Sequence, residues 1–288
     1  MKTIYFDCAM GAAGDMLTAA LLELAPDREA ALAKLNALGV PGVRFAAAKT
    51  VKCGITGTQR TVTVDGEEED AGGHAHHHEH GGCGHRHDHV REDMGAHGHE
   101  HDKHGRCHDL HHDHGHRHVH RGMADIEAVV GGLNASESVR SQVLKVYGLI
   151  AAAESAVHGV PVTEIHFHEV GALDAVADIA AVCTLMEDLA PRRVLASPVN
   201  VGGGHVRCAH GVMPVPAPAT ALLLRGVPMY GGRVSAELCT PTGAALLKHF
   251  VADFCPMPVM TVSSIGYGMG KKDFEAANCV RAFLGESE

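Results

Sequence analysis

A single turn in the second half of the chain carries the side chains best suited to chemistry. His166 and His168 alternate with Phe167, and Glu169 and Gly171 follow at once. On an extended strand both imidazoles would point the same way while Phe167 points into the core. Gly171 would then permit a sharp turn. The stretch therefore predicts a strand that presents two imidazoles and a carboxylate at its end.

A helical pattern begins at Leu173, with Asp174 and Asp178 one turn apart on one face. Two nitrogen ligands and up to three carboxylates would then converge, a mixture that suits a divalent transition metal. A structural alternative explains the same residues, with both histidines satisfied in the core. In that case Asp174 caps the helix and Asp178 faces solvent.

The second concentration of chemistry is a histidine-rich segment. Of 25 histidines, 19 lie between His74 and His120, among Gly, Asp and Glu and almost no apolar residues. Such a segment cannot offset the entropy of ordering itself, so we expect it to be disordered without ligand. Its His-x-His spacings offer loose sites for Ni²⁺, Zn²⁺, Cu²⁺ or Co²⁺. We interpret it as a metal collector, with ligand candidates at His76, His78, His85, His87, His112, His114, His116 and His118.

A third candidate lies near the amino terminus. A strand over residues 3–7 ends at Asp7, and a small-residue turn with Gly11 and Gly14 opens into a helix at Asp15. Free N–H groups at a helix start can hold an anion, although no Gly-Lys-Ser/Thr follows. The alternative is that the glycines only let helix and strand pack closely.

Composition excludes several classes of protein. The net charge of −10, the absence of Trp and the 4% aromatic content argue against a nucleic-acid partner. No apolar run is long enough to span a bilayer. Nine scattered cysteines without a C-x-x-C pair fit a reduced cytoplasmic protein.

We expect an α/β fold in which a mixed sheet is covered by helices. Strands are predicted at 3–7, 43–64, 193–201 and 259–265, with a glycine-rich stretch over 266–270 after the last. Residues 1–65 and 122–288 should form one globular domain, interrupted by the long disordered His-rich insertion at 66–121.

Taken together, these segments resemble the LarC family, the nickel-insertion proteins of nickel-pincer cofactor biosynthesis. The matching stretches follow the family's order along nearly the whole chain. They are Tyr5-Phe6-Asp7 with Gly11 and Gly14-Asp15-Met16, Ala153-Glu154 with Val157-His158-Gly159, Ile165–Gly171 with Asp174, His210-Gly211 with Pro214–Pro218, Glu237 with Thr240–Gly243, and Gly266–Gly270.

The resemblance implies a CTP-dependent enzyme that inserts Ni²⁺ into a pyridinium bis-thiocarboxylate mononucleotide. The product would be the (SCS)Ni pincer cofactor of lactate racemase. Under this hypothesis His166, His168 and Glu169 hold nickel in transit, while Asp174 or Asp178 orients an imidazole or a carboxylate there acts as base.

Other residues take lesser parts in this hypothesis. Asp7 and Asp15, with Gly11, Gly14 and Glu237, are expected to bind the phosphate-bearing ligand or Mg²⁺, and His158, His210 and Glu237 are reserve candidates for the metal. Family members usually continue into a carboxyl-terminal domain that carries the CTP chemistry, with Mg²⁺ or Mn²⁺. We therefore place no CTP site on these residues, and expect that domain and apo lactate racemase as partners.

Two other functions fit some of the same features. A non-catalytic nickel chaperone or store would use the histidine-rich segment and treat the globular part as a docking body. A zinc-dependent hydrolase built on His166 and His168 is weaker, because no H-E-x-x-H helix accompanies them.

Overall fold

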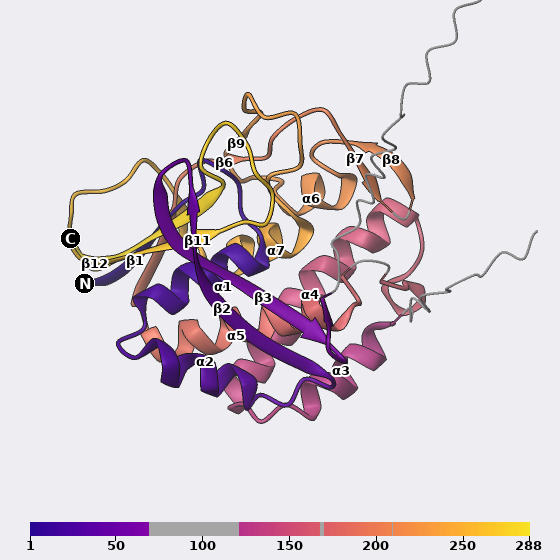
Figure 1. Ribbon diagram of the computed structural model, residues 1–288. Coiled ribbons are helices and arrows are strands. Elements are labelled where there is room, and N and C mark those ends of the chain that lie inside the picture. Colours follow the sequence, from indigo (N-terminus) through magenta and orange to yellow (C-terminus); the bar gives the residue numbers. More distant parts are fainter. Residues whose placement is uncertain (69–120, 168–169, 209) are drawn as a thin grey trace, which may run out of the picture. The chain divides into compact units, whose positions relative to one another are not determined.

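A computed structural model describes residues 1–68, 121–167, 170–208 and 210–288, which belong to one compact unit (Figure 1). The predicted disordered metal collector, with its ligand candidates from His76 to His118, lies outside the described residues. So do His168 and Glu169. These predictions stay predictions.

The main sheet is mixed, as expected. Its strand order is β10-β5-β1-β12-β11-β3-β2, with β4 paired to β3. Strand β1 runs parallel to β5 and antiparallel to β12, and β12 runs antiparallel to β11. The strands are β1 (Lys2–Asp7), β2 (Val43–Lys52), β3 (Ile55–Val64), β4 (Glu67–Glu68), β5 (Arg193–Ala196), β10 (Asp253–Phe254), β11 (Met260–Met269) and β12 (Cys279–Ser287).

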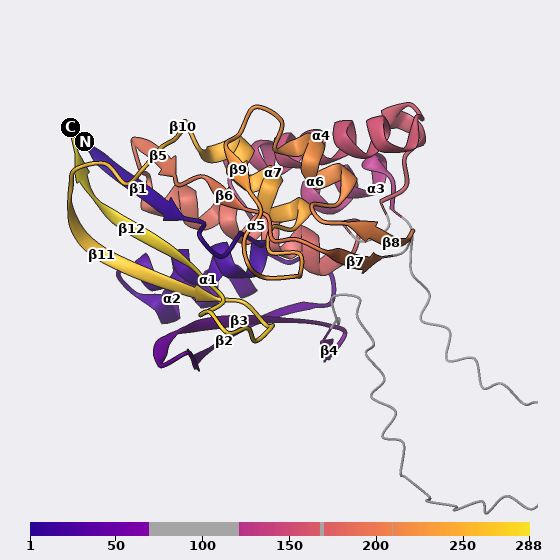
Figure 2. The ribbon, with the colours of Figure 1, turned by 90° about the horizontal axis from the view of Figure 1, so that it is seen from above.

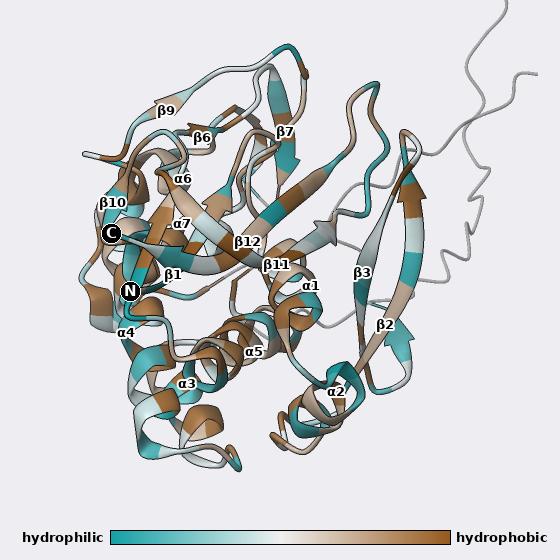
Figure 3. Ribbon diagram, turned by 90° about the vertical axis from the view of Figure 1, so that its left-hand side faces the viewer, coloured by the Kyte–Doolittle hydropathy of each residue, from teal (hydrophilic) through white to brown (hydrophobic). Residues whose placement is uncertain are grey.

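Helices α1 and α5 lie on one side of β1, β11 and β12 (Figure 2). The helices are α1 (Gly14–Leu24), α2 (Arg28–Asn36), α3 (Met123–Gly131), α4 (Glu137–His158), α5 (Leu173–Leu189), α6 (Pro218–Leu223) and α7 (Pro241–Phe250), with a 3₁₀ turn at Val162–Glu164. Helix α5 is hydrophobic along most of its length and is the central helix of the core (Figure 3). In the described part of the chain, no helix is long and apolar enough to cross a bilayer.

Residues 266–269 of the glycine-rich stretch belong to strand β11, which corrects the expectation that the strand ends at Ile265. Gly266 and Gly268 occupy alternate positions, and both face α1. A Cβ on Gly268 would lie 1.8 Å from the backbone oxygen of Met16, and one on Gly266 would lie 2.1 Å from that of Ala20. The glycines therefore let the helix backbone lie directly on the strand.

A further prediction about strands is wrong. The expected strand over 193–201 divides into β5 and β6 (Val199–Asn200), because Pro198 lacks a backbone N–H for a continuous ladder. Strand β6 pairs instead with β9 (Met229–Tyr230). In the described part of the expected strand at His166, up to Phe167, there is an isolated bridge, in which the N–H of Phe167 donates to the oxygen of Arg121 at 3.0 Å.

Local capping residues set the ends of α4 and α7. Ser136 caps α4 by accepting from the N–H of Val139, and Gly159 ends that helix in the left-handed conformation with φ of 67°. Thr240 caps α7 by accepting from the N–H of Gly243, and Pro241 occupies the first turn. Strand β12 and the hairpin of β7 (His205–Cys208) and β8 (Gly211–Pro214) are absent from the strands predicted above.

Candidate functional site

Two buried aromatic side chains, Phe167 and Tyr147, hold the turn before α5 against the core. Phe167 is buried, and its ring meets that of Tyr147 edge-on with centroids 5.7 Å apart. The Tyr147 hydroxyl donates to the oxygen of Val170 at 3.0 Å. A Cβ on Gly171 would lie 2.7 Å from that of Phe167, so this position requires glycine. The turn is therefore held in one place relative to the core.

His166 lies exposed on this turn, on the opposite side from the buried Phe167, as the alternation predicted. Asp174, half-buried in the first turn of α5, accepts from the N–H of Ala175 at 2.7 Å, whereas Ala172 occupies the N-cap. The nickel role of His166, His168 and Glu169 stays a prediction.

Asp178 is part of a buried ion pair. It contacts the guanidinium of Arg60 on β3, and their side chains are only 13% and 5% exposed. Burial lowers the pKa of Arg60, while the charges of Asp15 and Asp174 act in the opposite direction. The alternative in which Asp178 faces solvent is therefore wrong. Its predicted part in metal binding stays a prediction, and a metal ion would have to compete with Arg60 for the Asp178 carboxylate.

The predicted glycines Gly11 and Gly14 both lie at close backbone contacts. A Cβ on Gly14 would lie 2.7 Å from that of Asp178, so α1 and α5 meet at this point. Gly11 has φ of 78°, and a Cβ there would lie 1.9 Å from the oxygen of Leu238. Close packing explains both glycines, and a role in holding the organic ligand stays a prediction.

Glu237 lies where segments distant in the sequence meet. It forms a bridge with Gly202, and the N–H of Ala12 donates to the oxygen of Leu238 at 3.0 Å. Burial, followed by the charge of Glu237, raises the pKa of Cys239 to about 12. That thiol therefore stays protonated, which makes it a poor metal ligand.

The structure brings together His158 and His210, two reserve candidates 52 positions apart in the sequence. His158 is the last residue of α4 and His210 directly precedes β8; their ring centroids lie 4.8 Å apart. The Nε2 atom of His158 also lies 3.3 Å from Oε2 of Glu154, one helical turn earlier. Among the residues that the structure describes, no group of three or more His, Cys, Asp or Glu side chains is arranged to hold a metal ion. The imidazole pair therefore supplies two nitrogen donors that lie close together.

Asp7 binds Arg281, a residue that sequence reasoning did not select. The Nε atom of Arg281 donates to Oδ2 of Asp7 at 2.9 Å, and the Nη2 atom contacts the same oxygen. Burial lowers the pKa of Arg281, but the hydrogen bond and the charge of Asp7 outweigh it and raise that pKa overall. The alternation of Val280, Ala282 and Leu284 with Arg281 was the available signal, since it indicates a strand with Arg281 on the opposite face.

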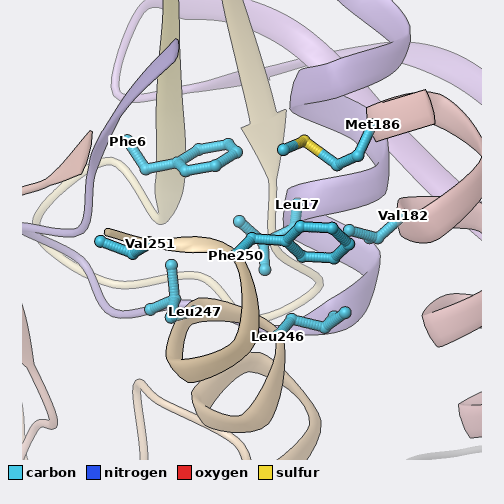
Figure 4. A pocket seen from close by; sticks show the side chains of 8 residues that line it. All are labelled: Phe6, Leu17, Val182, Met186, Leu246, Leu247, Phe250 and Val251. Atoms are coloured by element: carbon cyan, nitrogen blue, oxygen red, sulfur yellow. The ribbon is translucent and has the colours of Figure 1, made fainter. Parts of the chain in front are cut away.

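A small pocket lies in the hydrophobic core (Figure 4). Its volume of about 10 Å³ has room for about one water. The lining is entirely apolar and comes from β1, α1, α5, α7 and the residue after α7: Phe6, Leu17, Val182, Met186, Leu246, Leu247, Phe250 and Val251. It is a packing defect of the core and too small for an organic ligand.

Comparison with known proteins gives a consistent result. A family model described as nickel insertion protein matches residues 4–288. A pyridinium-3,5-bisthiocarboxylic acid mononucleotide nickel insertion protein of Geobacillus kaustophilus is 35% identical over 99% of this chain and 60% of its own length. The protein of the same name in Clostridium acetobutylicum is 37% identical over 100% of this chain and 65% of its own length.

A putative nickel insertion protein of Dictyoglomus thermophilum is 35% identical, over 99% of this chain and 61% of its own length. The chain thus spans about three-fifths of the length of these curated relatives. No solved structure matches the chain. The resemblance to LarC proteins is confirmed, and the chain belongs to the nickel insertion protein family.

Proposed function

We propose that this chain inserts nickel into pyridinium-3,5-bisthiocarboxylic acid mononucleotide and so forms the (SCS)Ni pincer cofactor of lactate racemase. The observation that carries the proposal is the family match over residues 4–288, together with relatives whose names state this substrate. Nickel is a substrate in this reaction, so the protein needs a transit site and not a permanent metal centre.

We assign the transit site to the imidazole pair and the turn before α5. His158 and His210 supply two nitrogen donors, and Glu154 supplies a carboxylate near His158. The predicted ligands His166, His168 and Glu169 would add nitrogen and oxygen donors of the kind that suit Ni²⁺.

The reaction exchanges a proton for a metal and involves no net oxidation or reduction. The ring carbon between the two thiocarboxylates loses its proton to a base, and the electron pair of that C–H bond forms the C–Ni bond. The two sulfur atoms complete the pincer. Asp178 contacts Arg60 directly, whereas half-buried Asp174 acts on Arg60 only through its charge, so Asp174 suits the role of base better than Asp178.

We place the CTP-dependent step, with Mg²⁺ or Mn²⁺, outside these residues. The chain spans about three-fifths of its relatives, and the remaining part of those proteins is available for nucleotide chemistry. The lyase class of the reaction and its cytoplasmic location follow from the same proposal. Apo lactate racemase is the expected recipient of the product.

The test is reactivation of apo lactate racemase by the purified chain with Ni²⁺, CTP and the bisthiocarboxylate mononucleotide. One mixture contains the chain alone, and a second also contains the additional part of a longer relative. Activity only in the second mixture would support a nickel-handling role with CTP use elsewhere. Activity of the chain alone would contradict our placement of the CTP step, and no activity in either would contradict the proposal.

The histidine-rich segment favours a second candidate function, a nickel chaperone or store. The 19 histidines between His74 and His120 exceed what one transit site needs. Deletion of residues 74–120 distinguishes the two. A store would lose its nickel capacity and its function, whereas an insertase supplied with excess Ni²⁺ should keep most of its rate.

A further inference from the structure

Three of the four tyrosines in the chain gather around the Asp7–Arg281 pair. In the sheet register, Arg281 on β12 lies between Tyr267 on β11 and Asp7 on β1. Directly opposed residues share a face, so these three side chains form one row across the sheet. Tyr5 and Phe283 oppose each other in the neighbouring row, with ring centroids 6.3 Å apart.

This row lies on the face of the sheet that α1 does not cover. Gly266 and Gly268 turn toward α1, so the alternating Tyr267 points the other way. The side chain of Arg281 is 45% exposed there, and Tyr230 on β9 is 43% exposed. Tyr230 pairs in register with Asn200 on β6, and the N–H of Asn200 donates to the oxygen of Cys8 at 3.2 Å, so Tyr230 lies close to the end of β1.

Asp7 orients the guanidinium of Arg281 through only some of its N–H groups. Asp7 engages Nε and Nη2, and Oδ1 of Asp7 is itself fixed by the N–H of Ala9 at 3.0 Å. The carbon of the guanidinium lies 5.4 Å from the Phe283 ring centroid, within the range of a cation–π contact. The fork also carries the Nη1 amino group, whose donors suit the oxygen or sulfur atoms of a carboxylate-like group or the oxygens of a phosphate.

We infer that Arg281, with Tyr267 and Tyr230, forms the binding platform for the organic substrate. An anionic group of the ligand, either a thiocarboxylate or the phosphate, receives hydrogen bonds from Arg281, and the neighbouring part of the ligand packs against the tyrosines. Asp7 is then a positioning residue that holds Arg281, and not a ligand of Mg²⁺. This inference rests on the proposed function for the identity of the substrate.

The experiment measures the Kd of the full chain for the bisthiocarboxylate mononucleotide by calorimetry, without Ni²⁺ or CTP. We expect Arg281→Gln to weaken binding at least tenfold, and Arg281→Lys to weaken it less. Tyr267→Leu should lose several-fold in affinity, and Tyr267→Phe, which keeps the aromatic ring, should lose less. Arg44→Gln, which removes an exposed arginine from β2 of the same sheet, is the matched control and should bind normally.

The nucleoside that lacks the phosphate identifies the anion. If Arg281 holds the phosphate, Arg281→Gln weakens binding of the mononucleotide only; if it holds a thiocarboxylate, both ligands weaken equally. Unchanged binding by a folded Arg281→Gln, or no binding by the wild type, overturns the inference. Normal binding without nickel insertion would instead contradict the proposed function, so the two failures are distinguishable.

Discussion

Asp178 on α5 and Arg60 on β3 form a buried ion pair at the point where Gly14 of α1 touches the Asp178 side chain. The pair ties the β2–β3 hairpin to α5, the helix that follows the turn carrying His166 (the histidine turn). Asp15 and Asp174 both act electrostatically on the same guanidinium. The first turns of α1 and α5 are therefore held around one cation.

Removing one partner of this ion pair should lower the stability of the fold strongly, because the remaining charge stays buried without its partner. We expect Asp178→Ala to lower the free energy of unfolding by about 3–5 kcal/mol, and Arg60→Met/Asp178→Leu to cost less than either single change. Urea unfolding measures both. Lys34→Ala, which removes an exposed pair with Asp188, is the control and should cost at most about 1 kcal/mol. An equally small loss for Asp178→Ala would contradict this account.

Contact between α1 and β11 should tolerate no side chain at Gly268. A Cβ there meets the Met16 backbone oxygen at 1.8 Å, so Gly268→Ala must displace the helix. We expect a loss of about 1–3 kcal/mol or more from overpacking. The matched control is Gly148→Ala in α4, where a Cβ meets nothing within 4 Å. That change should stabilise by about 0.5–1 kcal/mol, since alanine favours the helix. Thermal unfolding tests both variants. We expect the Tm of Gly268→Ala to fall and that of Gly148→Ala to rise.

Gly268 also shows why sequence reasoning succeeded for helices and failed for this strand. The caps of α4 and α7 are local signals, written in Ser136, Gly159 and Thr240. The glycines of β11 are explained only by the backbone of α1 packed against them, and that contact joins residues about 250 positions apart in the sequence. Local patterns predict loop there, and tertiary packing overrides them.

The same limit applies to the candidate site. Asp7 and the histidine turn were selected from residue types at element ends. Arg281 was not, because its importance comes from register with Asp7 across β1 and β12. The contact between His158 and His210 likewise depends on the fold, because the two residues lie far apart in the sequence.

Glu23 should make stability depend on pH. Burial acts to raise the pKa of Glu23, but hydrogen bonds from Lys49, Thr58 and the N–H of Tyr267 lower it below the ordinary 4.5. A depressed folded pKa contributes stability that is complete above the unfolded value and is lost as pH falls through the folded value. We expect Glu23→Gln to flatten the loss of stability below about pH 4.5. Denaturant unfolding from pH 7 to pH 3 tests this, with the exposed Glu29→Gln as a control that keeps the wild-type slope.

The imidazole pair yields the most direct test of the nickel site. We expect His158→Ala and His210→Ala each to weaken one Ni²⁺ site about tenfold or more, because each removes one of two nitrogen donors. Calorimetric titration of a variant without residues 74–120 avoids the background of the histidine-rich segment. His205→Ala, an exposed histidine on β7, is the control.

The double variant gives the sharper result. If both imidazoles bind one ion, His158→Ala/His210→Ala should lose little more than either single change, since one missing donor already disables the site. Fully additive losses would mean two separate sites. Wild-type affinity in both single variants would remove this pair from the transit site and leave nickel binding to the histidine turn.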